Sequence, residues 1–360
     1  PAEKLGALRG VLAQDPRPAY QHDPGRVYGM TFAGFDVKFI VSDGTLTVTA
    51  ASATITNYGT IGRINHTGTG TLTVYNIGAN AKIGDVNSAG TVTLGKSNIT
   101  TATTEVGNEG EIGSITAANT ITIYRNTGTI GDLTAQTGAI RIGQGDSAAY
   151  AAYNVNSGTI GSVDAATTVY LYGGDVQSGN VAASAGQTIT AGSNVNIGTA
   201  TVPNQNTVGN ITTDAAVNVY NGENGSVGGV TAGTTVTIGA AANANAGDVG
   251  DISATGNVTV YNGGANLGAI DTAGTVYLYG NAGAIGNVTS TGNSVNVGGS
   301  NKTEANAAGQ VGNSGTIGDL TGTSVNVYRN TGKIGGLTAT STSVRVGQSD
   351  SSTEGVPAYN

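Results

Sequence analysis

The chain contains few of the side chains that fill a thick globular core. Its 360 residues include no cysteine, no tryptophan, one methionine and three phenylalanines. A globular domain of this length normally uses more large apolar residues, so the composition argues against a thick core. The absence of cysteine also excludes disulfide bonds and thiolate metal sites.

Charged residues are scarce too, with 14 Lys and Arg against 22 Asp and Glu and a net charge of −8. Nucleic-acid binding and polybasic membrane binding both need clustered basic residues. We therefore expect no nucleic acid as a partner and no membrane insertion by this segment, and no run reaches the roughly 20 apolar residues of a transmembrane helix. The low lysine content and the abundant Thr, Asn, Ser and Gly are typical of exported proteins and predict an extracellular or cell-surface location.

Glycine is abundant, with 60 residues, and many of these glycines belong to a short sequence repeat. Residues 126–142, NTGTIGDLTAQTGAIRI, show the unit: Ile-Gly and a polar residue, an aliphatic residue with Thr, a turn, and an alternating strand. The smallest steps between Ile-Gly anchors are 17 to 19 residues, and longer steps contain the same unit with an insertion. The anchors begin at Ile61, Ile83, Ile112, Ile130, Ile160, Ser178, Val208, Val227, Val249, Leu267, Ile285, Ile317 and Ile334.

This period, with alternation of apolar and polar residues inside it, predicts an all-β parallel β-helix, or β-solenoid, of about 13–14 turns. Stacked strands lie about 4.8 Å apart, so inward residues such as Val258 and Val260 should form continuous columns. A period near 18 suits two long strands and one short one, and the usual crossover preference predicts a right-handed coil. We expect each anchor glycine at a corner where no Cβ fits, followed by a turn-forming Asp or Asn.

Residues 1–45 differ from the repeats, and we assign residues 46–360 to the solenoid. Four of the six prolines lie within the first 24 residues, and all three phenylalanines lie between Phe32 and Phe39. Residues 2–14 have apolar residues at helical spacing, and residues 36–41 alternate like a strand. We interpret this region as an N-terminal cap, with one short helix, that covers the open end of the solenoid; the alternative is the tail of a longer N-terminal region.

The repeats are paired into two-turn units. Insertions follow the turns whose strand ends in Gly, whereas most turns that end in Tyr are short. The strand ends are Tyr75, Gly95, Tyr124, Gly143, Tyr172, Gly198, Tyr220, Gly239, Tyr261, Tyr279, Gly298, Tyr328 and Gly347. Residues 122–147 also recur as residues 326–351, which indicates duplication of a block of several turns.

The tyrosines at the strand ends are the candidate binding residues. Alternation sends them to the face opposite the inward valines, and a spacing of two turns is roughly 9.6 Å, close to the disaccharide repeat of an extended β-1,4-linked glucan. Sugar rings stack their apolar faces on aromatic rings. The alternative is that the insertions fold over the tyrosines and make a second small core. The predicted carbohydrate face is Tyr75, Tyr124, Tyr170, Tyr172, Tyr220, Tyr261, Tyr277, Tyr279 and Tyr328.

Signals for catalysis or metal binding are weak. His22 and His66 are the two histidines, and neither lies in a pattern typical of a hydrolase triad. Two pairs occupy the same place in the duplicated block: Arg141 with Asp146, and Arg345 with Asp350. Their more economical interpretation is an outward arginine beside a loop that its aspartate helps to fold, because glycoside hydrolysis needs paired carboxylates. Scattered aspartates do not supply the six to eight oxygens of a calcium site. We predict a non-enzyme without metal or cofactor.

From about residue 45 to residue 347, the coil period and the composition resemble those of parallel β-helix surface proteins. These are the filamentous-haemagglutinin-like adhesins and the tapirins, which bind cellulose. The resemblance implies an extracellular adhesive solenoid. We therefore expect a non-catalytic adhesin whose partner is an insoluble polysaccharide, with cellulose as the first candidate. The alternatives are a self-assembling surface-layer or filament protein, whose partners are other copies of itself, and a polysaccharide lyase or hydrolase.

Overall fold

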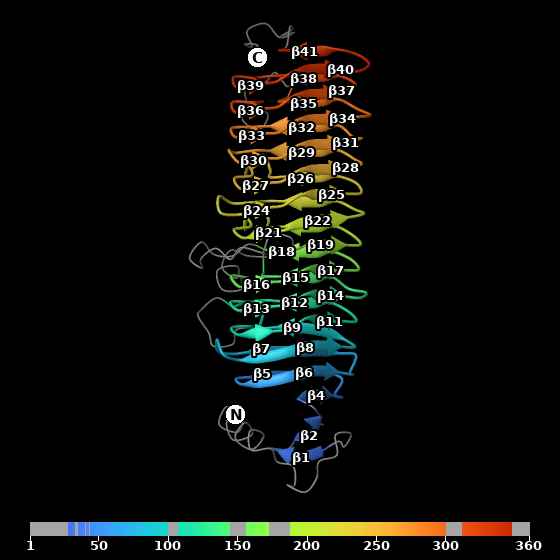
Figure 1. The fold of residues 1–360 in the computed structure, drawn as a ribbon, viewed down its shortest axis with the longest axis vertical. Coiled ribbons are helices and arrows are strands. Elements are labelled where there is room, and N and C mark those ends of the chain that lie inside the picture. Colours follow the sequence, from blue (N-terminus) through green and yellow to red (C-terminus); the bar gives the residue numbers. More distant parts are fainter. Residues whose placement is uncertain are drawn as a thin grey trace.

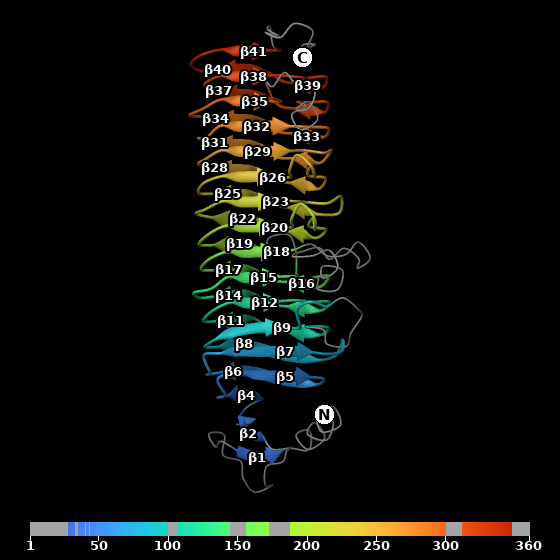
Figure 2. The ribbon, with the colours of Figure 1, turned by 180° about the vertical axis from the view of Figure 1, so that it is seen from behind.

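The protein is an all-β parallel solenoid in which most described turns contain two longer strands and one short strand. The computed structural model describes residues 28–32, 35–39, 41–42, 44–99, 107–144, 156–172, 188–299 and 312–347, and before residue 44 it describes the backbone alone. Figure 1 shows the strands stacked one above another along an upright column, and Figure 2 shows the same column from behind. The predicted β-solenoid is confirmed.

Two long parallel sheets run the length of the column. Sheet C contains β5 (Ala53–Asn57), β7 (Thr71–Asn76), β9 (Thr91–Leu94), β12 (Ile121–Ile123), β15 (Ile140–Ile142), β18 (Val169–Leu171), β20 (Val195–Ile197), β23 (Val217–Val219), β26 (Val236–Ile238), β29 (Val258–Tyr261), β32 (Val276–Tyr279), β35 (Val295–Val297), β38 (Val325–Val327) and β41 (Val344–Val346). Sheet B contains β4 (Thr45–Val48), β6 (Thr60–His66), β8 (Lys82–Ser88), β11 (Ile115–Ala117), β14 (Leu133–Ala135), β17 (Val163–Ala165), β19 (Thr188–Ala191), β22 (Asn210–Thr213), β25 (Val230–Ala232), β28 (Ile252–Ala254), β31 (Ile270–Thr272), β34 (Val288–Ser290), β37 (Leu320–Gly322) and β40 (Leu337–Ala339).

The third strand of a turn has two residues and carries the aliphatic residue of the anchor. Three of these short strands continue the first halves of β6 and β8: β10 (Glu111–Ile112), β13 (Thr129–Ile130) and β16 (Thr159–Ile160). Seven others form sheet D: β21 (Thr207–Val208), β24 (Ser226–Val227), β27 (Asp248–Val249), β30 (Asn266–Leu267), β33 (Ala284–Ile285), β36 (Thr316–Ile317) and β39 (Lys333–Ile334). The predicted anchor at Ser178 lies outside the described residues.

At the N-terminal end the pairing is antiparallel. β1 (Tyr28–Phe32) pairs with β2 (Phe35–Phe39), and β3 (Val41–Ser42) pairs with β4. Parallel pairing begins where β4 meets β6. The strand predicted over residues 36–41 corresponds to β2 and β3, whereas the helix predicted over residues 2–14 lies outside the described residues. The division of the chain into a cap and a solenoid stays a prediction.

The core is a set of aliphatic columns that run along the solenoid axis. Val236, Val258 and Val276 lie in register on neighbouring strands, and each is completely buried. One continuous cluster of Ile, Val, Leu and Ala extends through the described turns. Because each turn is thin and β-branched residues pack well on a pleated sheet, this core needs no tryptophan and no large aromatic filling.

The corner after each anchor is stabilised from one turn to the next. A Cβ on Gly84 would overlap the carbonyl oxygen of Gly62 in the preceding turn, which confirms that no side chain fits there. The reason is the close stacking of glycine on glycine, not a positive φ. The polar residue after the glycine accepts a hydrogen bond from a backbone N–H of the next turn: Asp85 from Ser114, Asp132 from Ser162, Asn210 from Gly229, Asp251 from Ala269, Asn287 from Asp319 and Asp319 from Gly336.

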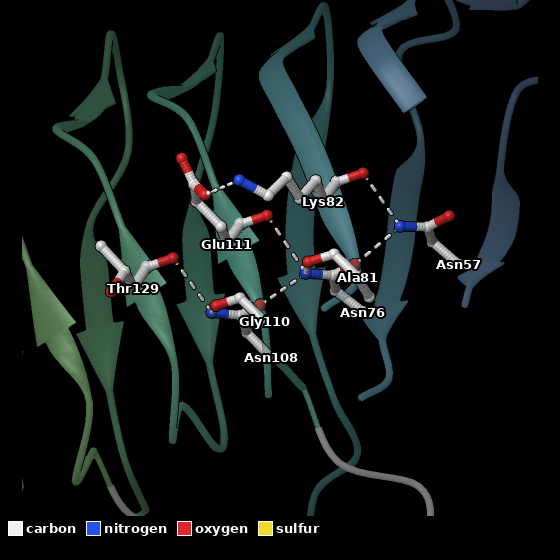
Figure 3. Close-up of polar contacts among 8 residues, drawn as sticks. All are labelled: Asn57, Asn76, Ala81, Lys82, Asn108, Gly110, Glu111 and Thr129. Atoms are coloured by element: carbon white, nitrogen blue, oxygen red, sulfur yellow. Dashed lines mark hydrogen bonds and ion pairs between the residues drawn. The ribbon is translucent and has the colours of Figure 1, made fainter. Parts of the chain in front are cut away.

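A buried column of asparagines lies at the corner between sheet C and the short strands. In Figure 3 the Nδ2 atom of Asn76 donates to Oδ1 of Asn108, at 2.8 Å, and also to the backbone carbonyls of Ala81 and Glu111. Four such side-chain bonds join one run, and three join a second run. The first run is Asn57, Asn76, Asn108, Asn126 and Asn156, and the second is Asn262, Asn281, Asn313 and Asn330; between them Asn204 bonds Asn221. Each bonded pair of amides therefore joins strands that belong to different turns.

Candidate polysaccharide-binding face

The predicted tyrosines lie on the outer face of sheet C, opposite the core columns. Two columns of outward side chains follow the solenoid axis: a middle column, which is the central residue of each three-residue strand, and an end column, which is the residue that follows it. In β32 the burial alternates, with Val276 and Leu278 inside and Tyr277 and Tyr279 outside. Tyr170 and Tyr277 belong to the middle column, and the other seven belong to the end column.

These tyrosines are half-buried rather than fully exposed. Tyr328 is buried, with 7 % of its surface exposed. The other eight have intermediate exposure: Tyr75, Tyr124, Tyr170, Tyr172, Tyr220, Tyr261, Tyr277 and Tyr279. In a β-strand the outward direction alone does not determine exposure, because neighbouring side chains and loops cover part of each ring.

Tyr124 and Tyr220, which belong to the end column, each lie on a turn between two loops that contact each other. The loops that begin at Gly95 and Gly143 lie one turn to either side of Tyr124, and Gln144 bonds Asn98 through two hydrogen bonds of 2.7 and 2.9 Å. In the same way, Nδ2 of Asn243 donates to the carbonyl of Ala200 across the turn that carries Tyr220. Contacts between the flanking loops therefore cross the turns that carry Tyr124 and Tyr220, while the buried tyrosine of the predicted face is Tyr328.

Tyr170 and Tyr172 form a first aromatic group. Their ring centroids are 6.0 Å apart and their planes differ by 14°. The guanidinium carbon of Arg141, from the neighbouring strand, lies 5.1 Å from the Tyr170 centroid. A cation over an aromatic face is attracted by the ring quadrupole, so Tyr170 holds the exposed Arg141 side chain in place on this face.

Tyr261, Tyr277 and Tyr279 form a second group, at the point where two Tyr turns follow each other. The Tyr261 and Tyr279 centroids are 5.1 Å apart, and those of Tyr277 and Tyr279 are 6.3 Å apart with planes that differ by 12°. Burial, followed by the neighbouring phenols of Tyr261 and Tyr277, raises the pKa of Tyr279 above its ordinary value of 10.0. The break in the Tyr and Gly alternation therefore creates the densest aromatic surface of the face.

The residues considered for catalysis do not come together in the described part of the chain. His66 is buried and occupies a core column, with Nδ1 2.8 Å from the Ser88 hydroxyl and Nε2 3.0 Å from the Ala50 carbonyl. Asp146, Asp350 and His22 lie outside the described residues. Within the described residues, no three His, Cys, Asp or Glu side chains gather closely enough to hold a metal ion. Nor does any helix in this part have the length and apolarity to span a membrane.

Two surface features were not singled out from the sequence. Tyr58 is 52 % exposed, more than any tyrosine of the predicted face, but it follows Asn57 at the end of β5 and lies outside the end column, where Thr56 pairs with Tyr75. A polar hollow of about 310 Å³ lies over sheet B and is lined by Asn65, Asn87, Thr116 and Gln136, among others. Its residues come from four successive turns, so a pattern confined to one repeat does not reveal it.

Comparison with known proteins adds one short match. The family model of the TrmO C-terminal domain matches residues 5–54. This segment ends as the parallel stacking begins and includes none of the tyrosines of the predicted face. No curated protein and no solved structure matches the chain.

Proposed function

We propose that the protein is a non-catalytic adhesive solenoid, located outside the cell, that binds an insoluble polysaccharide through the outer face of sheet C. The observation that carries this proposal is the pair of aromatic groups around Tyr170 and Tyr277. Both lie in the same outward column of one straight sheet. Aromatic rings fixed by stacking lose little conformational entropy when a sugar ring packs on them.

The two groups are suited to a long ligand. Five strand-to-strand steps separate β18 from β32 in sheet C, which is about 24 Å at about 4.8 Å per step. The middle column between them presents Asn196, Asn218, Thr237 and Thr259. Amides and hydroxyls of this kind donate and accept hydrogen bonds to sugar hydroxyls. Cellulose, whose disaccharide repeat is close to two turns, is the first candidate from spacing alone.

Retention on insoluble cellulose, xylan and chitin tests the proposal. We expect the protein to sediment with at least one of these polymers, and we expect a Tyr170→Ala and Tyr277→Ala double variant to lose most of that retention. A Tyr124→Ala and Tyr220→Ala double variant is the matched control, because it removes the same number of rings from positions flanked by contacting loops. If none of these three polymers retains the protein, the face does not bind an insoluble polysaccharide of this kind. If the first variant binds as well as the parent, the binding does not depend on these two aromatic groups.

A self-assembling surface protein is the second candidate, and the last described strand favours it. Val344 and Val346 of β41 continue the core columns of Val325 and Val327 but are 43 % and 68 % exposed. Another copy that added its own parallel strands at this edge would bury them. Filaments or ordered arrays in negative-stain images, lost on changing both valines to Lys, support this candidate; a monodisperse monomer at high concentration argues against it.

A further inference from the structure

The charges of the described residues are divided unequally among the faces of the solenoid. All eleven described carboxylates lie outside the strands of sheet C: Asp85, Glu109, Glu111, Asp132, Asp164, Asp214, Glu223, Asp248, Asp251, Asp271 and Asp319. The charged side chains within the fourteen strands of sheet C are Arg141 and Arg345. A chain with a net charge of −8 therefore keeps one face free of described carboxylates and places two cations on it.

The two arginines occupy equivalent positions in the middle column. Arg141 pairs in register with Thr122 and Tyr170, and Arg345 pairs with Asn326. Both are exposed, and neither forms an ion pair with a carboxylate among the described residues. Arg63 and Lys82, which lie outside sheet C, instead pair with Asp85 at 3.4 Å and Glu111 at 2.8 Å. Arg141 and Arg345 therefore present their charges on the tyrosine face without a carboxylate partner among the described residues.

From this arrangement, and resting on the proposed function, we infer that the ligand is an extended acidic polysaccharide that lies parallel to the solenoid axis. Nine steps in sheet C separate β15 from β41, which is about 43 Å at about 4.8 Å per step. Arg141 and Arg345 bind acidic groups near the two ends of this span, and the rings of Tyr170 and Tyr277 stack on sugars between them. A guanidinium binds a carboxylate or sulfate through two parallel hydrogen bonds, which a neutral glucan does not offer.

The same face fits a nucleic acid poorly. A nucleic-acid strand carries one phosphate per nucleotide, and proteins that bind it line the track with many cations. Here two arginines are spread over nine steps, and the middle column between them offers amides, hydroxyls and the two rings of Tyr170 and Tyr277. The few cations and many neutral polar side chains of this column suit a polymer that offers mostly hydroxyl groups and few acidic groups.

The test compares polygalacturonate with cellulose as probes for the full chain. We expect tighter binding to polygalacturonate than to cellulose, and an affinity for polygalacturonate that falls as salt rises, because salt screens exposed charges. An Arg141→Ala and Arg345→Ala double variant should bind about 100-fold more weakly, because each charge-assisted contact accounts for about tenfold. An Arg63→Ala and Lys82→Ala double variant makes the same change in net charge elsewhere and should bind like the parent.

Ligand length gives a second readout that does not depend on any substitution. If one disaccharide matches two strand-to-strand steps of about 4.8 Å, an oligomer of about four sugars covers about four of the nine steps between the arginines. Such an oligomer contacts one arginine at a time, so it should bind much more weakly than the polymer. The inference of an acidic ligand is wrong if the protein binds cellulose and polygalacturonate equally, or if the arginine double variant binds polygalacturonate as tightly as the parent. Either result leaves the proposed polysaccharide binding intact. Equal affinity for single-stranded DNA also overturns the inference. Loss of all polysaccharide binding instead removes the proposed function on which it rests.

Discussion

Asn221 and Asn245 occupy equivalent corners of adjacent turns, yet no hydrogen bond joins their side chains. Nδ2 of Asn221 donates to the backbone carbonyl of Asp248, at 3.3 Å, and Oδ1 of Asn245 is buried without a partner. Other equivalent side chains bond directly, as Asn204 does to Asn221 at 2.9 Å, but Asn245 and Asn262 do not. The asparagine ladder is therefore interrupted at Asn245, whose Nδ2 donates to the Gly247 carbonyl instead.

This interruption predicts that two equivalent asparagines differ in their effect on stability. Asn108 donates to Asn126, Gly110 and Thr129 and accepts from Asn76. Replacing it with Ala leaves several buried groups without partners, and we expect the free energy of unfolding to fall by about 3 kcal/mol. Asn245→Ala removes an oxygen that already lacks a partner, so we expect a loss nearer to about 1 kcal/mol.

Urea unfolding and hydrogen exchange in the neighbouring strands measure both variants. Exchange is the sharper measurement, because a solenoid can unfold a few turns at a time. Lys82→Ala, which removes the exposed ion pair drawn in Figure 3, is a control and should change the urea midpoint little. Equal losses for Asn108→Ala and Asn245→Ala would contradict the interrupted ladder.

The fold could be predicted well from the sequence because each turn repeats the same pattern of anchor, turn and alternating strand. The Ile-Gly anchors located the short strands, and alternation around Val258 and Val260 identified the inward columns. The asparagine ladder was missed although most of its members stand four residues before an anchor, as Asn126 does before Ile130. A polar residue beside Gly in a turn is ordinarily a surface residue, and only the stacking of turns shows that these amides are buried and bonded to one another.

The candidate site was predictable only in its orientation. The period of two sent Tyr277 and Tyr279 to the outer face, and the structure places them there. Their exposure depends on contacts between different turns, such as Gln144 with Asn98, which are 46 residues apart. The position of Arg141 over Tyr170 likewise follows from strand register and not from their separation in sequence.

The anchor glycines predict a second pair of contrasting variants. A Cβ on Gly84 would overlap the backbone of Gly62, whereas a Cβ on Gly59 has no atom within 4 Å and its backbone lies outside the left-handed region. We expect Gly84→Ala to reduce the free energy of unfolding by about 3 kcal/mol, because the backbone of the stacked turns must move. Gly59→Ala should stay within about 0.5 kcal/mol of the parent. Urea midpoints measure both, and a tolerated Gly84→Ala would argue against tight stacking at this corner.

The aromatic group at Tyr279 predicts a dependence on alkaline pH. Burial, then the phenols of Tyr261 and Tyr277, raise its pKa above 10.0, so the folded protein holds this proton more tightly than the unfolded chain. Its contribution to stability is complete below pH 10.0 and is lost as the pH rises through the raised folded pKa. Ultraviolet titration of phenolate absorbance should show one late tyrosine that disappears in Tyr279→Phe. A parent and variant with superimposable titrations would contradict this assignment.

The corner carboxylates predict that Asp132 acts through one oxygen and not through its charge. Its Oδ1 accepts a hydrogen bond from the Ser162 backbone N–H at 2.8 Å, and Asn210 and Asn287 make the same contact elsewhere with an amide oxygen. Asp132→Asn should therefore leave the urea midpoint close to that of the parent, whereas Asp132→Ala should cost about 1 kcal/mol for the lost bond. Hydrogen exchange at Ser162 gives the local readout, with faster exchange in the Ala variant alone. If the Asn variant were as unstable as the Ala variant, the negative charge itself would be the stabilising element.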